Sequence, residues 1–397
     1  MPLLTRRRLL QTAAALPLAA GLPGRLAPAA EPPRVLVLVE LNGGNDGLNT
    51  VVPYADPAYA RARPTLSVPR DRVLQLDERL GLHPALAPLM PAWQAGDMAL
   101  ALGVGYRRPN RSHFRSIEIW NSASAADEVL QHGWLHRVLA ETGIAATAPP
   151  PGFAAQGIVL GGPPGPLAGG ALPTVTLRDP RQLHEAAARP DDGAADGGAA
   201  AGNPSLAHIL ATRRQLRGAA AEIDRRLAAT PALATPFPNT DLGGQLRQAA
   251  RLIAAGTGAS LFKLQHGGYD THAGQAGRHA ALLAELGEGL AAFRDAMIEA
   301  GCWRRCLVMT YAEFGRRVAE NASGGTDHGS AAPQILLGGR LRGGLLGSQP
   351  PLDDLEDGDL RPLLDFRRLY AAVSQDWLGL PPAPGSLGRQ LPLPLIA

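Results

Sequence analysis

Runs of branched apolar residues that alternate with helical patterns constrain the fold of this chain most. The first run, from Val35 to Glu40, is apolar at successive positions, as in a strand buried on both faces of a parallel sheet. A loop rich in glycine and asparagine follows it at once, at 41–47. Further runs that resemble buried strands lie at 98–103, 157–160, 259–264, 307–310 and 333–338.

Helical patterns separate several of these runs, and they cover 205–228, 241–256, 277–299 and 366–378. Strands that alternate with helices predict an α/β fold, with a mostly parallel central sheet and helices on both faces. A length of 397 residues allows one large domain or two smaller ones. We expect residues 31–397 to form a single domain. The Ala-, Gly- and Asp-rich stretch at 185–204 has no periodicity and predicts a flexible insertion.

The first thirty residues have the features of a twin-arginine signal peptide. An arginine pair within 6–8 precedes a leucine pair, an apolar stretch runs from Ala13 to Leu22, and Ala27-Pro28-Ala29 offers a cleavage site. The apolar stretch is too short and too broken by proline to span a bilayer stably. The alternative is a retained anchor. We therefore expect the twin-arginine machinery to export a protein that works in the periplasm or outside the cell.

Charge and cysteine content exclude some classes of function. The formal net charge is +3, and the positive charge is scattered with no dense basic stripe, so nucleic acid is not expected as a partner. Only two cysteines occur, Cys302 and Cys306, and neither has a zinc-finger spacing with histidine. Two buried free thiols are expected, and a local disulfide is the alternative.

Acidic and histidine side chains gather where the predicted strands end. Asp46, the pair Asp270 and His272, and Glu313 each lie a few residues past a predicted strand. Ligands bind beyond the carboxyl ends of the strands in such sheets, so these side chains are expected at one edge. Asp327-His328 instead precedes a strand, so its loop should reach back over that edge. Histidine with carboxylate and no cysteine suits Zn, Mn, Mg or Ca.

Each of these positions also has a structural interpretation. Asp46 fits an Asx-turn, Asp270 and His272 fit the start of a capped helix, and Glu313 fits a surface position. His279 lies within the helical pattern that follows and is expected at the surface.

Ser112 precedes a helical pattern that continues through Trp120. It suits a helix N-cap, and it also suits a nucleophile or a metal ligand. A helix N-terminus attracts anions, and Arg111 and Arg115 could add charge-assisted contacts to oxyanions.

Several of these stretches resemble an exported bacterial family, domain-of-unknown-function family 1501. The resemblance covers nearly the whole chain after the signal peptide. It is carried by Leu38–Thr50, Arg111-Ser112-His113-Phe114, Tyr269-Asp270-Thr271-His272, Glu313-Phe314-Gly315-Arg316 and Gly325-Thr326-Asp327-His328-Gly329. That family resembles a branch of the alkaline-phosphatase-like superfamily, which includes phosphatases, sulfatases and phosphomutases.

The resemblance implies a role for each matching residue. Asp46 matches the aspartate after the first strand, and Ser112 matches the nucleophile. Glu313 and Phe314 take the places of an Asp-His pair, and His328 matches the last histidine. Asp327 then orients a neighbouring imidazole or caps its loop.

One implied metal site consists of Asp270, His272 and His328. The second consists of Asp46, Ser112 and Glu313, and it contains oxygen ligands only, because phenylalanine cannot ligate. It would favour Mg, Ca or Mn or stay empty, so one or two divalent ions are expected.

The implied activity is metal-dependent hydrolysis of phosphate or sulfate esters, with a small-molecule or polymer substrate. Ser112 would attack the ester, Arg111 or Arg115 would contact the non-bridging oxygens, and His113 would protonate the leaving group. Phe314 motivates the alternative, a non-catalytic metal- or ligand-binding protein of the cell envelope on the same scaffold.

Overall fold

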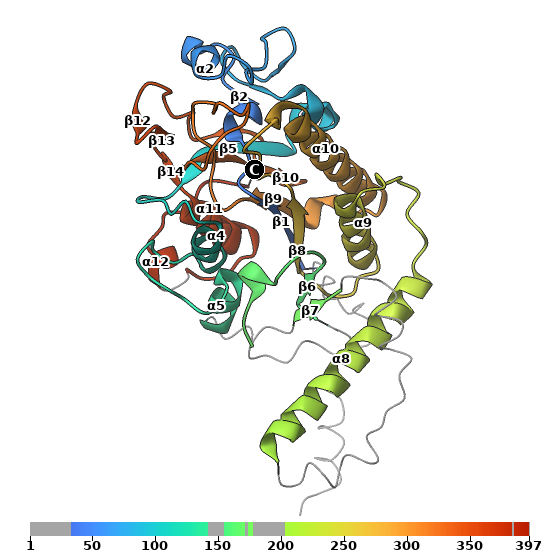
Figure 1. Cartoon of the computed structure of the whole chain (residues 1–397). Coiled ribbons are helices and arrows are strands. Elements are labelled where there is room, and N and C mark those ends of the chain that lie inside the picture. The colour runs from blue at the N-terminus through green and yellow to red at the C-terminus, as the bar shows by residue number, and fades with distance from the viewer. Residues whose placement is uncertain (1–32, 142–154, 171–173, 178–202, 383–384, 397) are drawn as a thin grey trace, which may run out of the picture. The chain divides into compact units, whose positions relative to one another are not determined.

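The computed structural model describes residues 33–141, 155–170, 174–177, 203–382 and 385–396 (Figure 1). The signal peptide expected at 1–30 lies outside the described residues. So does nearly all of the insertion expected at 185–204.

A nine-stranded sheet forms the centre of the described chain. Its strands follow the order β11-β5-β10-β9-β1-β8-β6-β7, and β14 pairs with β5. Their bounds are β1 Val35–Asn42, β5 Met98–Gly105, β6 Gly157–Val159, β7 Thr174–Thr176, β8 Leu261–Gly267, β9 Cys306–Tyr311, β10 Ala332–Gly338, β11 Gly344–Leu346 and β14 Leu364–Asp365. Two small sheets contain β2 Val51–Val52, β3 Leu74–Gln75 and β4 Gly81–Leu82, and β12 Leu355–Glu356 and β13 Asp359–Leu360.

The described helices include those predicted from the sequence. The α-helices are α2 Pro57–Ala62, α3 Met90–Gln94, α4 His113–Ser122, α5 Trp134–Glu141, α8 Pro204–Ala229, α9 Asp241–Ala254, α10 Gln275–Glu299, α11 Phe366–Ala372 and α12 Gly385–Gly388. Short 3-10 turns are η1 Gly47–Asn49, η2 Pro84–Leu89, η4 Gly165–Leu167 and η5 Trp303–Arg305, and η6 Val373–Trp377 is a π-helical turn. Among the described helices, none is both long and apolar enough to cross a membrane.

Strand β10 runs against the direction of the other strands. It pairs antiparallel with both β9 and β5, whereas β1 pairs parallel with β8 and β9. The start of β10 therefore lies at the edge where β1, β8 and β9 end. The loop of Asp327 and His328 lies at this edge, as expected, but it does not have to reach back to it, because the antiparallel direction of β10 starts the strand there.

Strand β1 is buried on both faces, as its sequence predicts. Val35, Val37 and Val39 join a core that includes Leu283 and Leu290 of α10. Leu36 and Leu38 join a second core on the other face, with Trp120 of α4 and Tyr370 of α11.

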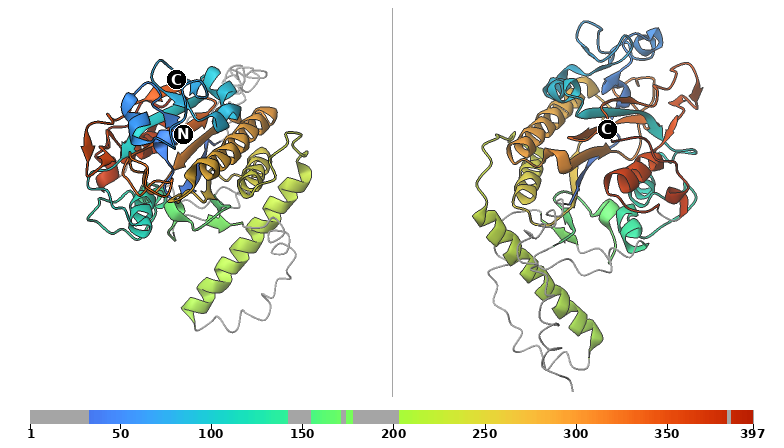
Figure 2. Two further views of the ribbon diagram at one scale, coloured as in Figure 1. Left: turned by 45° about the horizontal axis from the view of Figure 1, so that its top comes forward. Right: turned by 180° about the vertical axis from the view of Figure 1, so that it is seen from behind.

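Helices α9 and α10 lie on one side of the sheet, and α4, α5 and α11 lie on the other (Figures 1 and 2). The predicted α/β architecture, a mostly parallel sheet covered by helices on both faces, is confirmed. Cys302 and Cys306 are buried free thiols, as expected.

Candidate functional site

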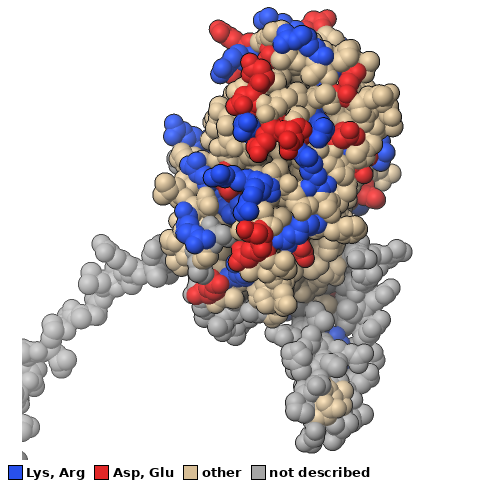
Figure 3. Space-filling model, turned by 60° about the vertical axis from the view of Figure 1, so that its left-hand side comes forward, with Lys and Arg blue, Asp and Glu red and all other residues tan. Residues whose placement is uncertain are grey.

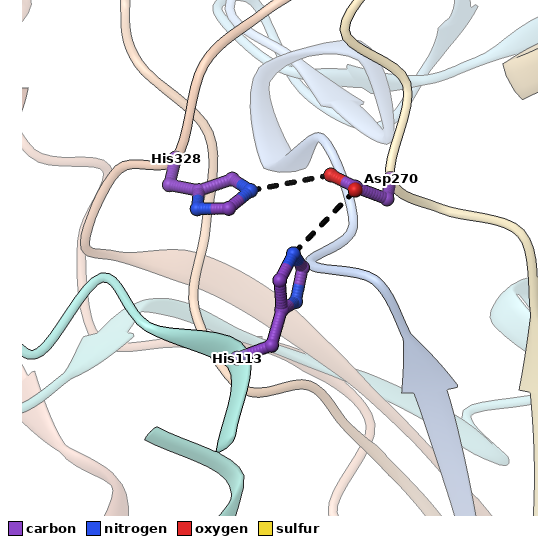
Figure 4. A group of neighbouring side chains, drawn as sticks. All are labelled: His113, Asp270 and His328. Atoms are coloured by element: carbon purple, nitrogen blue, oxygen red, sulfur yellow. Dashed lines mark hydrogen bonds and ion pairs between the residues drawn. The ribbon is translucent and has the colours of Figure 1, made fainter. Parts of the chain in front are cut away.

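Side chains from three loops meet beyond the carboxyl ends of the parallel strands (Figure 4). His113 begins α4, Asp270 follows β8, and His328 precedes β10. One nitrogen or oxygen atom from each lies within 4.8 Å of those from the other two. His272 adds a third imidazole, since its Nε2 lies 3.0 Å from Oδ1 of Asp270. We call these four residues the histidine cluster.

All three imidazoles turn Nε2 toward Asp270. Nε2 of His113 lies 3.5 Å from Oδ2 of Asp270, and Nε2 of His328 lies 3.2 Å from Oδ1. The Nε2 atoms of His272 and His328 are themselves 3.0 Å apart. The three ring nitrogens therefore all face the carboxylate of Asp270, and atoms of His113, Asp270 and His328 lie close enough to one another to share an ion.

The second nitrogen of each ring faces an oxygen atom. Nδ1 of His113 lies 2.9 Å from Oε1 of Glu313, and Nδ1 of His272 lies 3.2 Å from Oδ1 of Asp327. Nδ1 of His328 lies 2.8 Å from the backbone oxygen of Arg111. A carbonyl or an ionised carboxylate only accepts hydrogen bonds, so we assign the ring hydrogen to Nδ1 in all three. In the neutral imidazoles the Nε2 lone pairs then face the centre.

This donor set fits a divalent transition metal. Ligands at the zinc–nitrogen distance around a tetrahedral ion lie about 3.3 Å from one another. The separation of 3.0 Å between Nε2 of His272 and Nε2 of His328 is close to that value. Imidazole favours Zn over Mg or Ca, which prefer oxygen ligands.

The pKa values of two members of the cluster, Asp270 and His328, are shifted toward the deprotonated form. Burial raises the pKa of Asp270, but the hydrogen bond and positive charge of Arg316, with the neighbouring His328 and His272, outweigh it and lower the pKa to about 2. Burial lowers the pKa of His328, although Arg111 and Asp270 oppose this effect. An ionised carboxylate and a neutral imidazole are the states that bind a metal.

Arg316 is the residue of this site that the sequence did not reveal. Its side chain is fully buried, and one of its terminal nitrogens donates to Oδ1 of Asp270 at 2.6 Å. The motif Glu313-Phe314-Gly315-Arg316 contained it, but nothing in the sequence distinguishes a buried arginine from the many exposed ones.

Glu313 and Phe314 lie behind the cluster and contact its rings. Oε1 of Glu313 accepts from the backbone amide of Gly43 at 2.8 Å as well as from His113. Its Oε2 is buried and has no hydrogen-bonding partner among the described residues. The ring of Phe314 packs against His113 and His328, with centroids 4.9 and 4.4 Å away. Glu313 thus orients one imidazole, and Phe314 supports two.

Asp46 lies apart from the cluster, in a different set of contacts. Its carboxylate is buried and forms a salt bridge of 2.6 Å with Arg63, and it also accepts from Gln275. Burial raises the pKa of Asp46, and Arg63 with its other partners lowers it overall. The family resemblance grouped Asp46 with Ser112 and Glu313 in a metal site, but in the structure the carboxylate of Asp46 pairs with Arg63.

Ser112 lies between two residues that contact the cluster. The preceding carbonyl, of Arg111, accepts from His328, and the following side chain is His113. Ser112 is exposed, and it is the N-cap residue of α4 without making a side-chain capping bond. The expected N-cap position is observed, and its hydroxyl is not engaged in capping.

The two arginines expected to bind oxyanions are engaged elsewhere. Arg111 pairs with Asp359, and Arg115 bonds Glu118 at 2.8 Å within its own helix. Basic and acidic side chains are interspersed on the face that Figure 3 shows.

His279 also departs from expectation. It is buried in α10, and its Nε2 donates to Oδ1 of Asn45 at 2.9 Å. The prediction of a surface position is wrong because α10 turns this residue toward the loop after β1.

Apart from Ser112, the predicted site residues thus fall into three groups. Asp270, His272, His328 and His113 meet at the centre. Asp327 and Glu313 contact the imidazoles from outside, and Asp46, Arg111 and Arg115 are paired elsewhere.

Comparisons with known proteins place the chain in a family without giving it an activity. The sequence model of the family described as "Protein of unknown function (DUF1501)" matches residues 33–380. No curated protein matches the chain.

Among solved structures, the crystal structure of the PsFucS1 sulfatase from Pseudoalteromonas sp. matches with 10% sequence identity and a TM-score of 0.34. The match covers 79% of this chain and 64% of the sulfatase. A similarity of that size carries no argument about function.

Proposed function

We propose that this protein, which belongs to the DUF1501 family of proteins of unknown function, is a metal-dependent hydrolase of phosphate or sulfate esters. The observation that carries the proposal is the common orientation of the three imidazoles of the cluster. Each donates from Nδ1 to an oxygen and presents Nε2 to the carboxylate of Asp270.

The histidine cluster would hold the metal. His113, His272 and His328 supply neutral nitrogen ligands, and Asp270 supplies a negative charge. A bound divalent ion contributes a positive charge that stabilises negative charge developing on the ester oxygens. Glu313 and Asp327 keep two rings in the orientation that this requires.

Ser112 is the proposed nucleophile. Consecutive Cα atoms are about 3.8 Å apart, so a residue between Arg111 and His113 must lie at the rim of the cluster. Its Oγ would form a bond to phosphorus or sulfur while the bond to the ester oxygen breaks. The serine hydroxyl releases its proton to solvent, and the departing alcohol takes one from solvent. Water then cleaves the serine ester, which releases phosphate or sulfate and restores the hydroxyl.

The start of α4 supports an anionic substrate at this position. Ser112 does not cap the helix with its side chain, so amides of the first turn remain available beside the cluster. The position of His113 in the histidine cluster rules out the role expected for it, protonation of the leaving group. Its Nε2 faces Asp270, and a nitrogen that binds a metal cannot also protonate a leaving group.

The test is hydrolysis of 4-nitrophenyl phosphate and 4-nitrophenyl sulfate by the purified, metal-loaded full chain. Ser112→Ala should lower kcat by roughly a thousandfold or more, as loss of a nucleophile does. Ser348→Ala, at an exposed serine that belongs to none of the site's contacts, is the matched control and should leave kcat unchanged. Equal rates for Ser112→Ala and the wild type would show that Ser112 is not the nucleophile.

A second candidate is a non-catalytic metal- or ligand-binding protein of the cell envelope. The pairing of Arg111 with Asp359 and of Arg115 with Glu118 favours it, because neither guanidinium is left for an oxyanion. Tight metal binding without turnover of any phosphate or sulfate ester would support this candidate over the hydrolase.

Export remains part of the proposal. The arginine pair and apolar stretch within the first thirty residues support transport by the twin-arginine route. Substituting Arg6 and Arg7 together by lysine should hold the protein in the cytoplasm, as measured by cell fractionation. Undiminished export of that variant would contradict the route.

A further inference from the structure

We infer that Arg316 supplies the second positive charge of this site from within the chain, so that the site takes one divalent ion and not two. This inference rests on the proposed metal site, and it concerns the number of ions and the residue that sets it.

The guanidinium of Arg316 is enclosed by oxygen atoms. Nε donates to the carbonyl of Gly44 at 2.7 Å, and Nη1 donates to that of Thr326 at 2.8 Å. Nη2 lies 3.1 Å from the carbonyl of Tyr269, and it also contacts the carbonyl of Gly43. A carboxylate oxygen of Asp270 completes the set at 2.6 Å. Such a set of carbonyl and carboxylate oxygens is what a hard cation takes as ligands.

These oxygens come from three loops, and two of these loops also carry residues of the histidine cluster. Gly43 and Gly44 follow β1, Tyr269 follows β8, and Thr326 lies in the loop before β10. Arg316 itself lies after β9. A planar group with five hydrogen-bond donors can satisfy several carbonyls at once, which the compact ammonium of lysine cannot. Arg316 is therefore placed to hold these loops and Asp270 in one arrangement.

A second arginine, Arg63, binds the carboxylate of Asp46, which was expected to be a ligand of a second ion. Arg63 is fully buried, and its Nη1 lies 2.6 Å from Oδ2 of Asp46 and 2.7 Å from Oδ1 of Asn49. Its other donors bind the carbonyls of Val318 and Arg317, both at 2.9 Å. The carboxylate of Asp46 is thereby neutralised by a residue of the chain.

Arg316 thus occupies the oxygen-rich position beside the cluster, and Arg63 occupies the one at Asp46. A second divalent ion there would face the charge of Arg316, and it would have to displace Arg63 to reach Asp46. The second metal site expected from the sequence contained the carboxylates of Asp46 and Glu313. Within the described residues, Oε2 of Glu313 is the one oxygen of these two carboxylates that has no hydrogen-bonding partner. One such atom is too few to form a site.

The first test is the metal content of the full chain after saturation with Zn or Mn and removal of excess by gel filtration. The expected result is about one ion per chain. Two ions per chain would overturn this inference and leave the proposed function standing. No bound ion would overturn both.

The second test separates the charge of Arg316 from a purely structural role. Arg316→Ala should weaken metal binding by roughly 10- to 100-fold, as the loss of a supporting contact does. Guanidinium chloride at a low, non-denaturing concentration should restore much of that affinity by refilling the oxygen cage. Arg317→Ala is the matched control, because the Arg317 side chain pairs only loosely, at 3.6 Å, with Asp359. Wild-type affinity in Arg316→Ala, or a loss that guanidinium does not restore in a folded variant, would contradict the inference.

Asp46→Asn provides a test if Arg316→Ala does not fold. Its metal content should equal that of the wild type, because Asp46 binds Arg63 and not an ion. A fall from two ions in the wild type to one in Asp46→Asn would show that Asp46 is a ligand.

Discussion

The Nε2 atoms of His272 and His328 face each other at 3.0 Å, although each ring directs its Nδ1 hydrogen to an oxygen of the surrounding loops. Two neutral imidazoles in this state oppose their lone pairs. A cation or a proton between the rings turns that repulsion into attraction. The contact therefore favours a bound positive charge at the centre of the histidine cluster.

Removing one ring should reveal its share of metal binding. His328→Ala deletes a donor nitrogen and should weaken zinc binding by more than about 100-fold, beyond the loss typical of a supporting residue. Competition with a chromogenic chelator measures the dissociation constant. His132→Ala, at an exposed histidine outside the cluster, serves as the control and should bind as the wild type does. Unchanged affinity in His328→Ala would exclude this ring as a ligand.

Glu313 should act through His113. Glu313→Ala removes the acceptor for Nδ1 of His113 and should weaken metal binding by roughly 10- to 100-fold. Glu313→Gln keeps an oxygen that can accept from both Gly43 and His113, so its loss should be smaller. Calorimetric titration of the two variants with zinc compares them. Equal losses would mean that the charge of Glu313 matters and its hydrogen bond does not.

Acid should destabilise the protein through His279. Burial lowers the pKa of His279 to about 4, against about 6.5 in an unfolded chain. Between these values the unfolded state binds more protons, so the free energy of unfolding falls as the pH is lowered from about 6.5 to 4. The loss from this residue is on the order of 3 kcal/mol.

Chemical denaturation of the metal-free protein across this pH range measures that loss. His279→Gln should make the dependence on pH shallower, but it should not abolish it. The pKa of His83 is also lowered to about 4, mainly by burial, and His83 remains in the variant. A pH dependence identical to that of the wild type would contradict the assignment.

Gly325 should be needed for the position of His272. A Cβ atom at Gly325 would lie 2.2 Å from the backbone carbonyl carbon of His272, so Gly325→Ala must displace that loop. We expect destabilisation of about 1–3 kcal/mol and weaker metal binding. Gly277→Ala is the matched control, because a Cβ there meets nothing within 4 Å and the residue lies within α10. That variant should be neutral or slightly stabilised in thermal unfolding.

The buried strands could be predicted because their signal is local. The apolar run at 35–40 needs no knowledge of its neighbours to indicate a strand with two covered faces. The direction of β10 could not be predicted in this way, because it depends on how the chain crosses between strands. The loop of His328 was therefore expected at the correct edge, but with a chain that reaches back to it, which the antiparallel β10 makes unnecessary.

Part of the histidine cluster could be predicted because its signal, like that of the buried strands, is local in the sequence. His272 and His328 lie in glycine-rich loops at strand ends, where local sequence indicates ligands. The pairing of Asp46 with Arg63 depends instead on a tertiary contact between loops. The burial of Arg316 among carbonyls of three loops depends on such contacts too, and an arginine in sequence shows neither its burial nor its partners.

The most direct measurement is the transition-metal content of the folded full chain, determined by mass spectrometry in parallel with the double variant His272→Ala/His328→Ala. The histidine cluster predicts about one ion per wild-type chain and little in the variant. A metal-free wild type after loading, or equal metal content in the two proteins, would contradict the proposed metal site.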